Sequence, residues 1–292
     1  MSVIGFIGLG NMGMPMAVNL HEAGHEVKCF DMSQAVLRQA AQHGMKPQQS
    51  VAATVEGADF VVSMLPSGKH VLEVMANDGV AYPRDCVAID CSTIDIVSCS
   101  GFHKALSERG VLSLDAPVSG GVGGAAAGTL TFMVGGSDDA FARGLPVLRA
   151  MGKNIIHAGS EGAGQAAKIC NNMITGISMV AVSEALNLAR NLGLDMQKFF
   201  DIASTSSGQC WALTSYSPEP GLVPASPSNR EYEGGFASEL MLKDLRLAEQ
   251  AALASNSPAL LGAAAASLYA IHCHGGQGRL DFSSVIQMMR KR

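Results

Sequence analysis

The chain has 292 residues, 48% of them hydrophobic, which is enough to bury one large core and a second one. Its net charge is -5 and its lysines and arginines are scattered, so a nucleic-acid partner is not expected. Apolar stretches are interrupted before the roughly 20 residues needed to span a bilayer, no targeting segment precedes the first expected strand, and seven cysteines without CxxC pairs indicate reduced thiols. We therefore expect a cytoplasmic enzyme with no membrane partner.

A short apolar strand pattern at residues 3–7 leads directly into a GxGxxG turn. Gly8 permits a sharp exit from the strand, Gly10 allows a pyrophosphate to lie against bare backbone, and Gly13 lets the next helix pack closely on the sheet. A helix expected from Asn11 to about Ala23 would direct its first N–H groups at the phosphates. The turn consists of Gly8, Leu9, Gly10, Asn11, Met12 and Gly13. It predicts a dinucleotide site, whereas the same spacing alone could be a turn without a ligand.

A second strand is predicted at residues 26–30, and Asp31 stands at its end. A carboxylate about 20 residues after such a turn can accept both ribose hydroxyls of an adenosine and would repel a 2′-phosphate. No arginine follows Asp31, so the pattern favours NAD over NADP. The alternative is a solvated carboxylate, or the cap of a helix that starts near Ser33.

The first half of the chain continues to alternate strand and helix signals, which predicts a Rossmann-type parallel α/β sheet. Further strands are expected at residues 60–64, 87–90, 112–115, 130–134 and 154–157. Ligands gather at the carboxyl ends of parallel strands, so three strand ends are candidates for a site. These are Leu65-Pro66-Ser67, Ser92-Thr93 and the segment from Ala116 to Gly121.

Ser119, Gly120 and Gly121 combine a hydroxyl with two unhindered backbone N–H groups after the strand that contains Asp115. Such a group can bind a small carboxylate. An ordinary turn is the alternative, because glycine and alanine are abundant in the residues that follow.

From residue 162 to about 192 the strand signals give way to one long helical period. A helix of about 30 residues would be about 45 Å long, which is too long for one small domain to cover. We expect residues 1–161 to form a dinucleotide-binding domain, 162–192 a long interdomain helix, and 193–292 an all-α C-terminal domain. A loop rich in Pro and Gly at 217–235 would lie at the active site or on the surface.

The long helix carries the strongest catalytic candidates, Lys168 and Asn172, four residues apart on one helical face. Their neighbours are mostly small or apolar, so we expect partial desolvation to lower the pKa of Lys168. Such a lysine can exchange a proton with a hydroxyl while hydride leaves the same carbon, and Asn172 can hold that hydroxyl. The alternative is a lysine that reaches the surface beside a structural asparagine.

Histidines give no persuasive metal site. His21 and His25 match HExxH, which needs both on one continuous helix, but Gly24 should end the helix before His25. His272 and His274 lack partner ligands at a suitable spacing. We expect no metal.

Three motifs together resemble the β-hydroxyacid dehydrogenase family. They are GLGNMGxPMAxNL from Gly8 to Leu20, DAPVSGG from Asp115 to Gly121, and GQxxKxxNN from Gly164 to Asn172. Within that family, four later segments resemble the 3-hydroxyisobutyrate dehydrogenase branch: 208–218, 232–236, 243–245 and 281–285. The likeness covers nearly the whole chain in the same order.

This resemblance implies a catalytic role for Lys168, with Asn172 positioning the hydroxyl and Ser119, Gly120 and Gly121 binding the substrate carboxylate. It implies NAD contacts from the glycine turn, Asp31, Leu65, Pro66, Thr93 and Lys243. It also implies a homodimer or homotetramer that oxidises (S)-3-hydroxyisobutyrate to methylmalonate semialdehyde in valine breakdown.

Two departures from the branch leave the substrate open. After Trp211 the mammalian-type enzymes resemble Ser-Ser-Asp-Thr-Tyr, whereas this chain has residues 212–216 as Ala-Leu-Thr-Ser-Tyr, without the acidic residue. Ile96 replaces a common proline. L-serine, tartronate semialdehyde or another short 3-hydroxy acid is therefore an alternative substrate. Glyoxylate or succinic semialdehyde reductases that use NADPH should carry Arg or Lys after the second strand, and a non-catalytic dinucleotide-binding module should lack Lys168.

Overall fold

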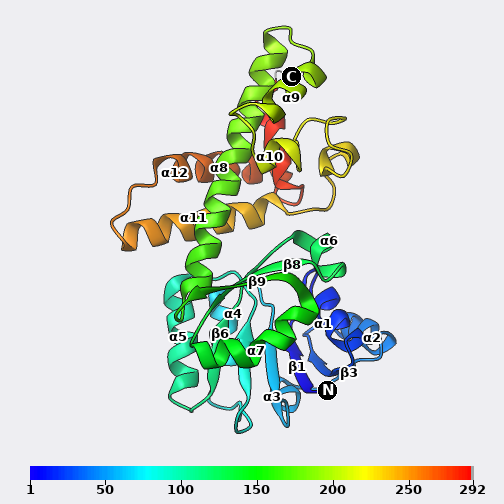
Figure 1. Ribbon diagram of the computed structural model, residues 1–292, viewed down its shortest axis with the longest axis vertical. Coiled ribbons are helices and arrows are strands. Elements are labelled where there is room, and N and C mark those ends of the chain that lie inside the picture. Colours follow the sequence, from blue (N-terminus) through cyan, green and yellow to red (C-terminus); the bar gives the residue numbers. More distant parts are fainter. Residues whose placement is uncertain (291–292) are drawn as a thin grey trace. The chain divides into compact units, whose positions relative to one another are not determined.

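A computed structural model describes residues 1–290 of the chain. The chain divides into two compact units, residues 1–168 and residues 169–292, with the division inside one long helix. The first unit is an α/β sheet and the second is helical (Figure 1). This confirms the expected fold class, while the three-part domain boundaries at 161 and 192 remain a prediction.

The first unit contains a sheet of nine strands in the described residues, in the order β3-β2-β1-β4-β5-β6-β8-β7, with β9 paired to β8. The pairs from β3 to β6 are parallel. The connection changes direction between β1 and β4, which is where an open sheet of this kind binds its ligand. The strands are β1 (Val3–Ile7), β2 (Glu26–Phe30), β3 (Lys46–Pro47), β4 (Phe60–Ser63), β5 (Val87–Asp90), β6 (Leu112–Asp115), β7 (Val118–Ser119), β8 (Leu130–Gly135) and β9 (Gly152–Gly159).

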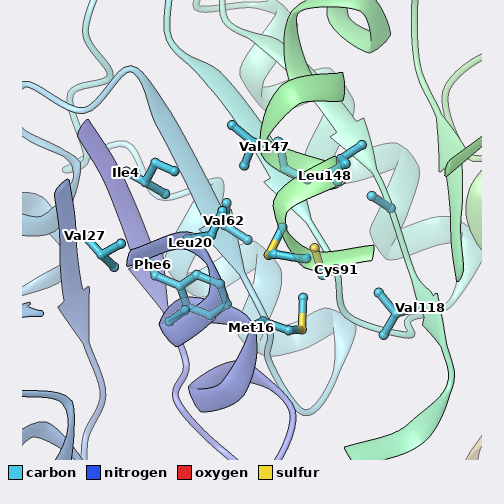
Figure 2. Packing of buried hydrophobic residues seen from close by; sticks show 14 of the residues in the cluster. Ile4, Phe6, Met16, Leu20, Val27, Val62, Cys91, Val118, Val147 and Leu148 are labelled. Carbon is cyan, nitrogen blue, oxygen red and sulfur yellow. The ribbon is translucent and has the colours of Figure 1, made fainter. Parts of the chain in front are cut away.

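Two hydrophobic cores cover the two faces of this sheet. One core packs α1, α2 and α7 on the strands, and the other packs α3, α4 and α5. Figure 2 shows the first core, where Phe6 of β1 and Val62 of β4 lie near Met16 and Leu20 of α1. The helices of this unit are α1 (Gly13–Glu22), α2 (Gln34–Gln42), α3 (Val51–Val55), α4 (Gly68–Met75), α5 (Ile96–Ser107), α6 (Gly121–Ala126) and α7 (Asp138–Met151). Central strands buried on both faces explain why β1 and β5 are almost wholly apolar.

The far edge of the sheet differs from the expected all-parallel arrangement. Strand β8 runs antiparallel to β6 and β7, and β9 then pairs parallel to β8. Only residues 120–129, which include the six-residue α6, separate β7 from β8. A connection that short suits an antiparallel pair because parallel strands need a longer crossover.

The second unit consists of helical elements and loops in its described residues, with one isolated antiparallel bridge between Ala237 and Asp281. Its core surrounds the fully buried Tyr269, whose hydroxyl donates to the carbonyl of Phe282 at 3.0 Å. The segment 217–235 is tied together, because the carbonyl of Ser217 accepts hydrogen bonds from Ser226 and Ser228. The elements are the main part of α8 (Ala163–Asn191), then α9 (Met196–Thr205), α10 (Trp211–Thr214), η1 (Pro227–Arg230), α11 (Ser238–Ala254), α12 (Leu260–His272), η2 (Cys273–Gln277) and η3 (Phe282–Met288).

Helix α8 alone, among the residues described, has the length and hydropathy of a membrane span. A core helix of a soluble protein has the same properties, and 44% of the apolar window in α8 is buried. One such helix is weak evidence for a membrane protein.

Candidate functional site

The three glycines of the N-terminal turn meet three different constraints. Gly8 has φ 91°, and a Cβ there would collide with the carbonyl of Met64. A Cβ on Gly13 would collide with the carbonyl of Gly8, so the start of α1 packs directly on the turn. At Gly10, by contrast, a Cβ would meet no described heavy atom within 4 Å. The space beside Gly10 is therefore open at the position where the sequence predicts a pyrophosphate.

Asp31 connects the end of β2 to this turn. Its Oδ2 accepts a hydrogen bond from Leu9 N–H and its Oδ1 accepts one from Ser33 N–H, both at 2.8 Å. Ser33, not Asp31, caps α2, because its Oγ accepts from Val36 N–H. A half-buried carboxylate with two oxygens can accept about four hydrogen bonds, so capacity for ribose hydroxyls remains.

The loops after β4 and β5 are joined through the hydroxyl of Ser92. This hydroxyl donates to Asp90 Oδ1 at 2.6 Å and accepts from Leu65 N–H at 2.8 Å. Ser63 donates to the same Asp90 oxygen at 2.8 Å. Complete burial raises the pKa of Asp90 from 3.8 to about 6, although these hydrogen bonds lower it in part. Asp90 therefore fixes the backbone beside two residues expected to bind the dinucleotide, Leu65 and Thr93.

Asp115 holds the first turn of α8. Its Oδ1 accepts from Gly162 N–H and its Oδ2 from Gln165 N–H, both at 2.8 Å. A helix N-terminus has unpaired N–H groups and a positive dipole end. A buried carboxylate there accepts hydrogen bonds from these N–H groups and its charge is stabilised by the dipole. His103 contacts Asp115 Oδ1 through Nε2 at 2.9 Å and Ser113 Oγ through Nδ1 at 2.7 Å.

Cys99, His103 and Asp115 lie close enough to hold a metal ion, with one potential ligand atom from each within 4.8 Å of the others. Protein groups already occupy both ring nitrogens of His103 and both oxygens of Asp115. Burial also raises the pKa of the Cys99 thiol, which disfavours the thiolate a metal would need. His103 and Asp115 thus belong to a hydrogen-bond network with Ser113, Gly162 and Gln165, and the Cys99 thiol lies buried beside it.

The segment Ser119-Gly120-Gly121 joins β7 to α6. Gly120 and Gly121 have φ 136° and 62°, which are backbone conformations that residues other than glycine rarely adopt. A Cβ on Gly121 would meet no described heavy atom within 4 Å, whereas Ser119 is half-buried and pairs with Thr131 of β8. The sheet therefore supports a hydroxyl beside an exposed glycine backbone.

Lys168 and Asn172 lie one turn apart on α8 and are 7% and 5% exposed. The Asn172 amide donates to Asp244 Oδ2 at 2.5 Å, and its carbonyl accepts from Asn171 at 3.0 Å. Lys243 Nζ lies 3.3 Å from Asp244 Oδ1. These contacts fix the orientation of the Asn172 amide and leave it one N–H to donate.

Helix α1 ends at Glu22, and Gly24 has φ 88°, so His21 and His25 do not share a helix. Neither histidine belongs to the one candidate metal group found in residues 1–290.

The segment that departs from the mammalian-type pattern forms α10. Ala212 and Leu213 face the core, and the Thr214 hydroxyl donates to the carbonyl of Cys210 at 3.1 Å. Trp211 is half exposed and stacks on Tyr216, with ring centroids 4.8 Å apart. Two of the changed residues therefore serve packing within this unit.

The sequence singled out the glycine turn, Asp31, the strand-end loops and Lys168, and these assignments remain predictions. It did not indicate the hydrogen bonds of Asp90, Asp115 and Gln165. A carboxylate at the end of a strand that the sequence predicts to be buried is the signal that could have singled out Asp90 and Asp115.

Two family profiles match nearly the whole chain, including every residue discussed above. The family profile for the NAD binding domain of 6-phosphogluconate dehydrogenase matches residues 3–159, and that for NAD-binding of NADP-dependent 3-hydroxyisobutyrate dehydrogenase matches residues 162–289. A mitochondrial 3-hydroxyisobutyrate dehydrogenase from Drosophila melanogaster is 46% identical over 99% of this chain and 89% of its own. An NAD-dependent L-serine dehydrogenase from Pseudomonas aeruginosa is 44% identical over 98% of this chain and 97% of its own.

Among solved structures, that of Mycobacterium tuberculosis 3-hydroxyisobutyrate dehydrogenase with L-serine matches with a TM-score of 0.95, at 45% identity and full coverage of both chains. The two family profiles, the identity over nearly the full length and the fold indicate the same family. The chain belongs to the 3-hydroxyisobutyrate dehydrogenase family of NAD-dependent hydroxyacid dehydrogenases.

Proposed function

We propose that the protein oxidises (S)-3-hydroxyisobutyrate to methylmalonate semialdehyde with NAD, as a step of valine breakdown. The observation that carries this proposal is the burial of Lys168 one helical turn before Asn172, whose amide is fixed by Asp244. A buried amine beside an oriented amide suits proton exchange with the hydroxyl of a substrate.

Different residues bind the substrate carboxylate, accept the hydroxyl proton and hold the reacting oxygen. Ser119 and the backbone N–H groups of Gly120 and Gly121 bind the substrate carboxylate and so orient the carbon that carries the hydroxyl. Lys168 accepts the hydroxyl proton as the C–O bond becomes a carbonyl, and Asn172 donates its remaining N–H to that oxygen. NAD, when bound, supplies the acceptor for the hydride that leaves the same carbon.

The cofactor site is formed by the glycine turn and the neighbouring loops. Gly8, Leu9, Gly10, Asn11, Met12 and Gly13 form the pyrophosphate-binding turn. Asp31 accepts from the ribose, and Leu65, Pro66 and Thr93 lie on loops that Asp90 and Ser92 hold together. Lys243 remains a predicted NAD contact from its position in the resembling motif.

L-serine is the second candidate substrate. One relative is named as an L-serine dehydrogenase, and the similar M. tuberculosis structure contains L-serine. Serine and 3-hydroxyisobutyrate share a carboxylate and a hydroxyl at carbon 3 and differ in an ammonium or a methyl group at carbon 2. The proposed carboxylate and proton-transfer residues fit both.

A homo-oligomer is the proposed assembly, with the helical unit as the contact surface. Helix α12 exposes Leu260, Leu261 and Ile271 on one side, between 62% and 83% accessible. Apolar side chains at this spacing form a stripe that a second copy can cover. A cytoplasmic location remains a prediction.

A substrate and cofactor matrix tests the proposal. Each of (S)-3-hydroxyisobutyrate, L-serine, glycerate and 4-hydroxybutyrate is assayed separately with NAD and with NADP. We expect the highest kcat/KM with (S)-3-hydroxyisobutyrate and NAD. Preference for L-serine would favour the second candidate, and preference for NADP would contradict the role given to Asp31.

A further inference from the structure

Gln165 links the first turn of α8 to the loop after β5. Its side chain is completely buried. The amide Nε2 donates to the carbonyl of Ser92 at 2.7 Å, and Oε1 accepts from the N–H of Ile94 at 3.1 Å. These two backbone groups flank Thr93, so one side chain grips the backbone on both sides of that residue.

The same residue is anchored through its own backbone. Its N–H donates to Asp115 Oδ2 at 2.8 Å, which fixes the position of the helix start against β6. On the other side, the Ser92 hydroxyl joins Asp90 and Leu65. The loop at residues 92–94 is therefore fastened from the sheet by Asp90 and from the helix by Gln165.

The chemistry of an amide explains why this position carries glutamine. An amide offers a donor and an acceptor about 2 Å apart, and here both are used by backbone groups of opposite kind. A leucine or methionine would fill the same volume but would leave both buried backbone groups unpaired. The paired hydrogen bonds fix the register between helix and loop, which apolar packing alone leaves adjustable.

Lys168 follows Gln165 by three residues, which is about 4.5 Å along the helix axis. A displacement of the first turn therefore moves the lysine with it, while the loop at 92–94 stays with the sheet. Misplacement of a reacting group by about 1 Å can lower the rate about 100-fold.

We propose that Gln165 is a positioning residue that sets Lys168 relative to the Thr93 loop. This inference rests on the proposed roles of Lys168 as proton acceptor and Thr93 as a cofactor contact. Gln165 acts through these two elements and touches neither substrate nor cofactor in the proposal.

The test replaces Gln165 with methionine in the full-length enzyme. We expect kcat for the preferred hydroxy acid to fall about 10- to 100-fold, with KM and the Kd for NAD within about threefold of the wild-type values. The kinetic isotope effect with substrate deuterated at the carbon that carries the hydroxyl should increase, because the chemical step becomes more rate-limiting. Gln197→Met, at an exposed amide on α9 that binds Asp201, is the matched control and should behave as wild type.

If Gln165→Met fails to fold, Gln165→Asn gives the same comparison. Asparagine keeps the amide donor and acceptor, but its side chain is one methylene shorter. A lower melting temperature with unchanged kcat and isotope effect in either variant would show a purely structural role and overturn the inference. Lys168→Ala is measured in parallel. If that variant keeps normal turnover, the proposed function fails and this inference with it; if it is inactive while the Gln165 variants are normal, only this inference fails.

Discussion

Asp90 and Asp115 stand in register at the ends of neighbouring parallel strands, and both are completely buried. Asp90 fixes the loops that contain Leu65 and Ser92, whereas Asp115 fixes the start of the helix that carries Lys168. Two neighbouring carboxylates at the carboxyl edge of the sheet thus hold the loops at Leu65 and Ser92 and the start of α8.

The titration of Asp90 should make stability depend on pH. Its folded pKa of about 6 lies above the ordinary 3.8, chiefly because burial disfavours the carboxylate. The folded state therefore binds more protons than the unfolded state between these values, and the free energy of unfolding decreases as pH rises through this window and levels off above it. Over about two pH units the total is on the order of 3 kcal/mol.

Urea denaturation of the wild type and Asp90→Asn between pH 4 and 8 measures this effect. The neutral asparagine removes the titration, so the variant should gain stability relative to the wild type as pH rises to about 6. A difference that stays constant across the range would mean that Asp90 does not titrate there.

Asp31→Asn should change cofactor choice. The amide keeps an acceptor for Leu9 N–H but removes the charge that repels a 2′-phosphate. We expect the ratio of kcat/KM for NAD over NADP to fall about tenfold or more, since hydrogen bonds to charged groups contribute about 1.5–3 kcal/mol.

Ser33→Ala is the control for Asp31. It removes the cap of α2 and should cost about 1 kcal/mol of stability, without changing the cofactor ratio. An unchanged ratio in Asp31→Asn would show that another residue selects the cofactor.

Gly10→Ala and Gly13→Ala should separate binding from folding. A methyl group on Gly10 enters open space, so the variant should keep its melting temperature but bind NAD more weakly, because the methyl occupies the proposed phosphate position. A methyl group on Gly13 meets the Gly8 carbonyl and should lower the melting temperature. Calorimetry and NAD titration give both quantities, and equal losses of stability in the two variants would contradict the assignment.

Asp244→Ala should impair catalysis through Asn172. The carboxylate accepts a hydrogen bond from the Asn172 amide and fixes its orientation, so its removal should lower kcat about tenfold. Because both side chains are buried, the melting temperature should fall as well. Steady-state kinetics of Asp244→Ala beside Asp201→Ala, an exposed carboxylate on α9, would measure this. Equal turnover in both variants would show that the orientation of Asn172 is unimportant.

The sequence predicted those parts of the fold and of the candidate site that depend on neighbouring residues. The strand, turn and helix from Val3 to Glu22 follow from a short apolar run and three glycines, and α8 follows from its uninterrupted helical period. Asp31 could be placed because its distance from the turn is fixed by one strand and one helix.

The parts that were not predicted depend on contacts between distant segments. Asp115 and Gln165 are 50 residues apart, and Ser92 and Gln165 are 73 apart. No spacing rule relates residues so far apart, and only the folded sheet brings them together. The antiparallel direction of β8 was not predicted either, because the residue pattern of a strand is the same in a parallel and an antiparallel pairing.

The central claim is that Lys168 accepts the hydroxyl proton, and Lys168→Ala tests it most directly. Turnover and NAD binding are measured on the same preparation with the preferred hydroxy acid. We predict a loss of at least about 100-fold in kcat with the Kd for NAD essentially retained. Near-normal kcat in a folded variant would contradict the assignment.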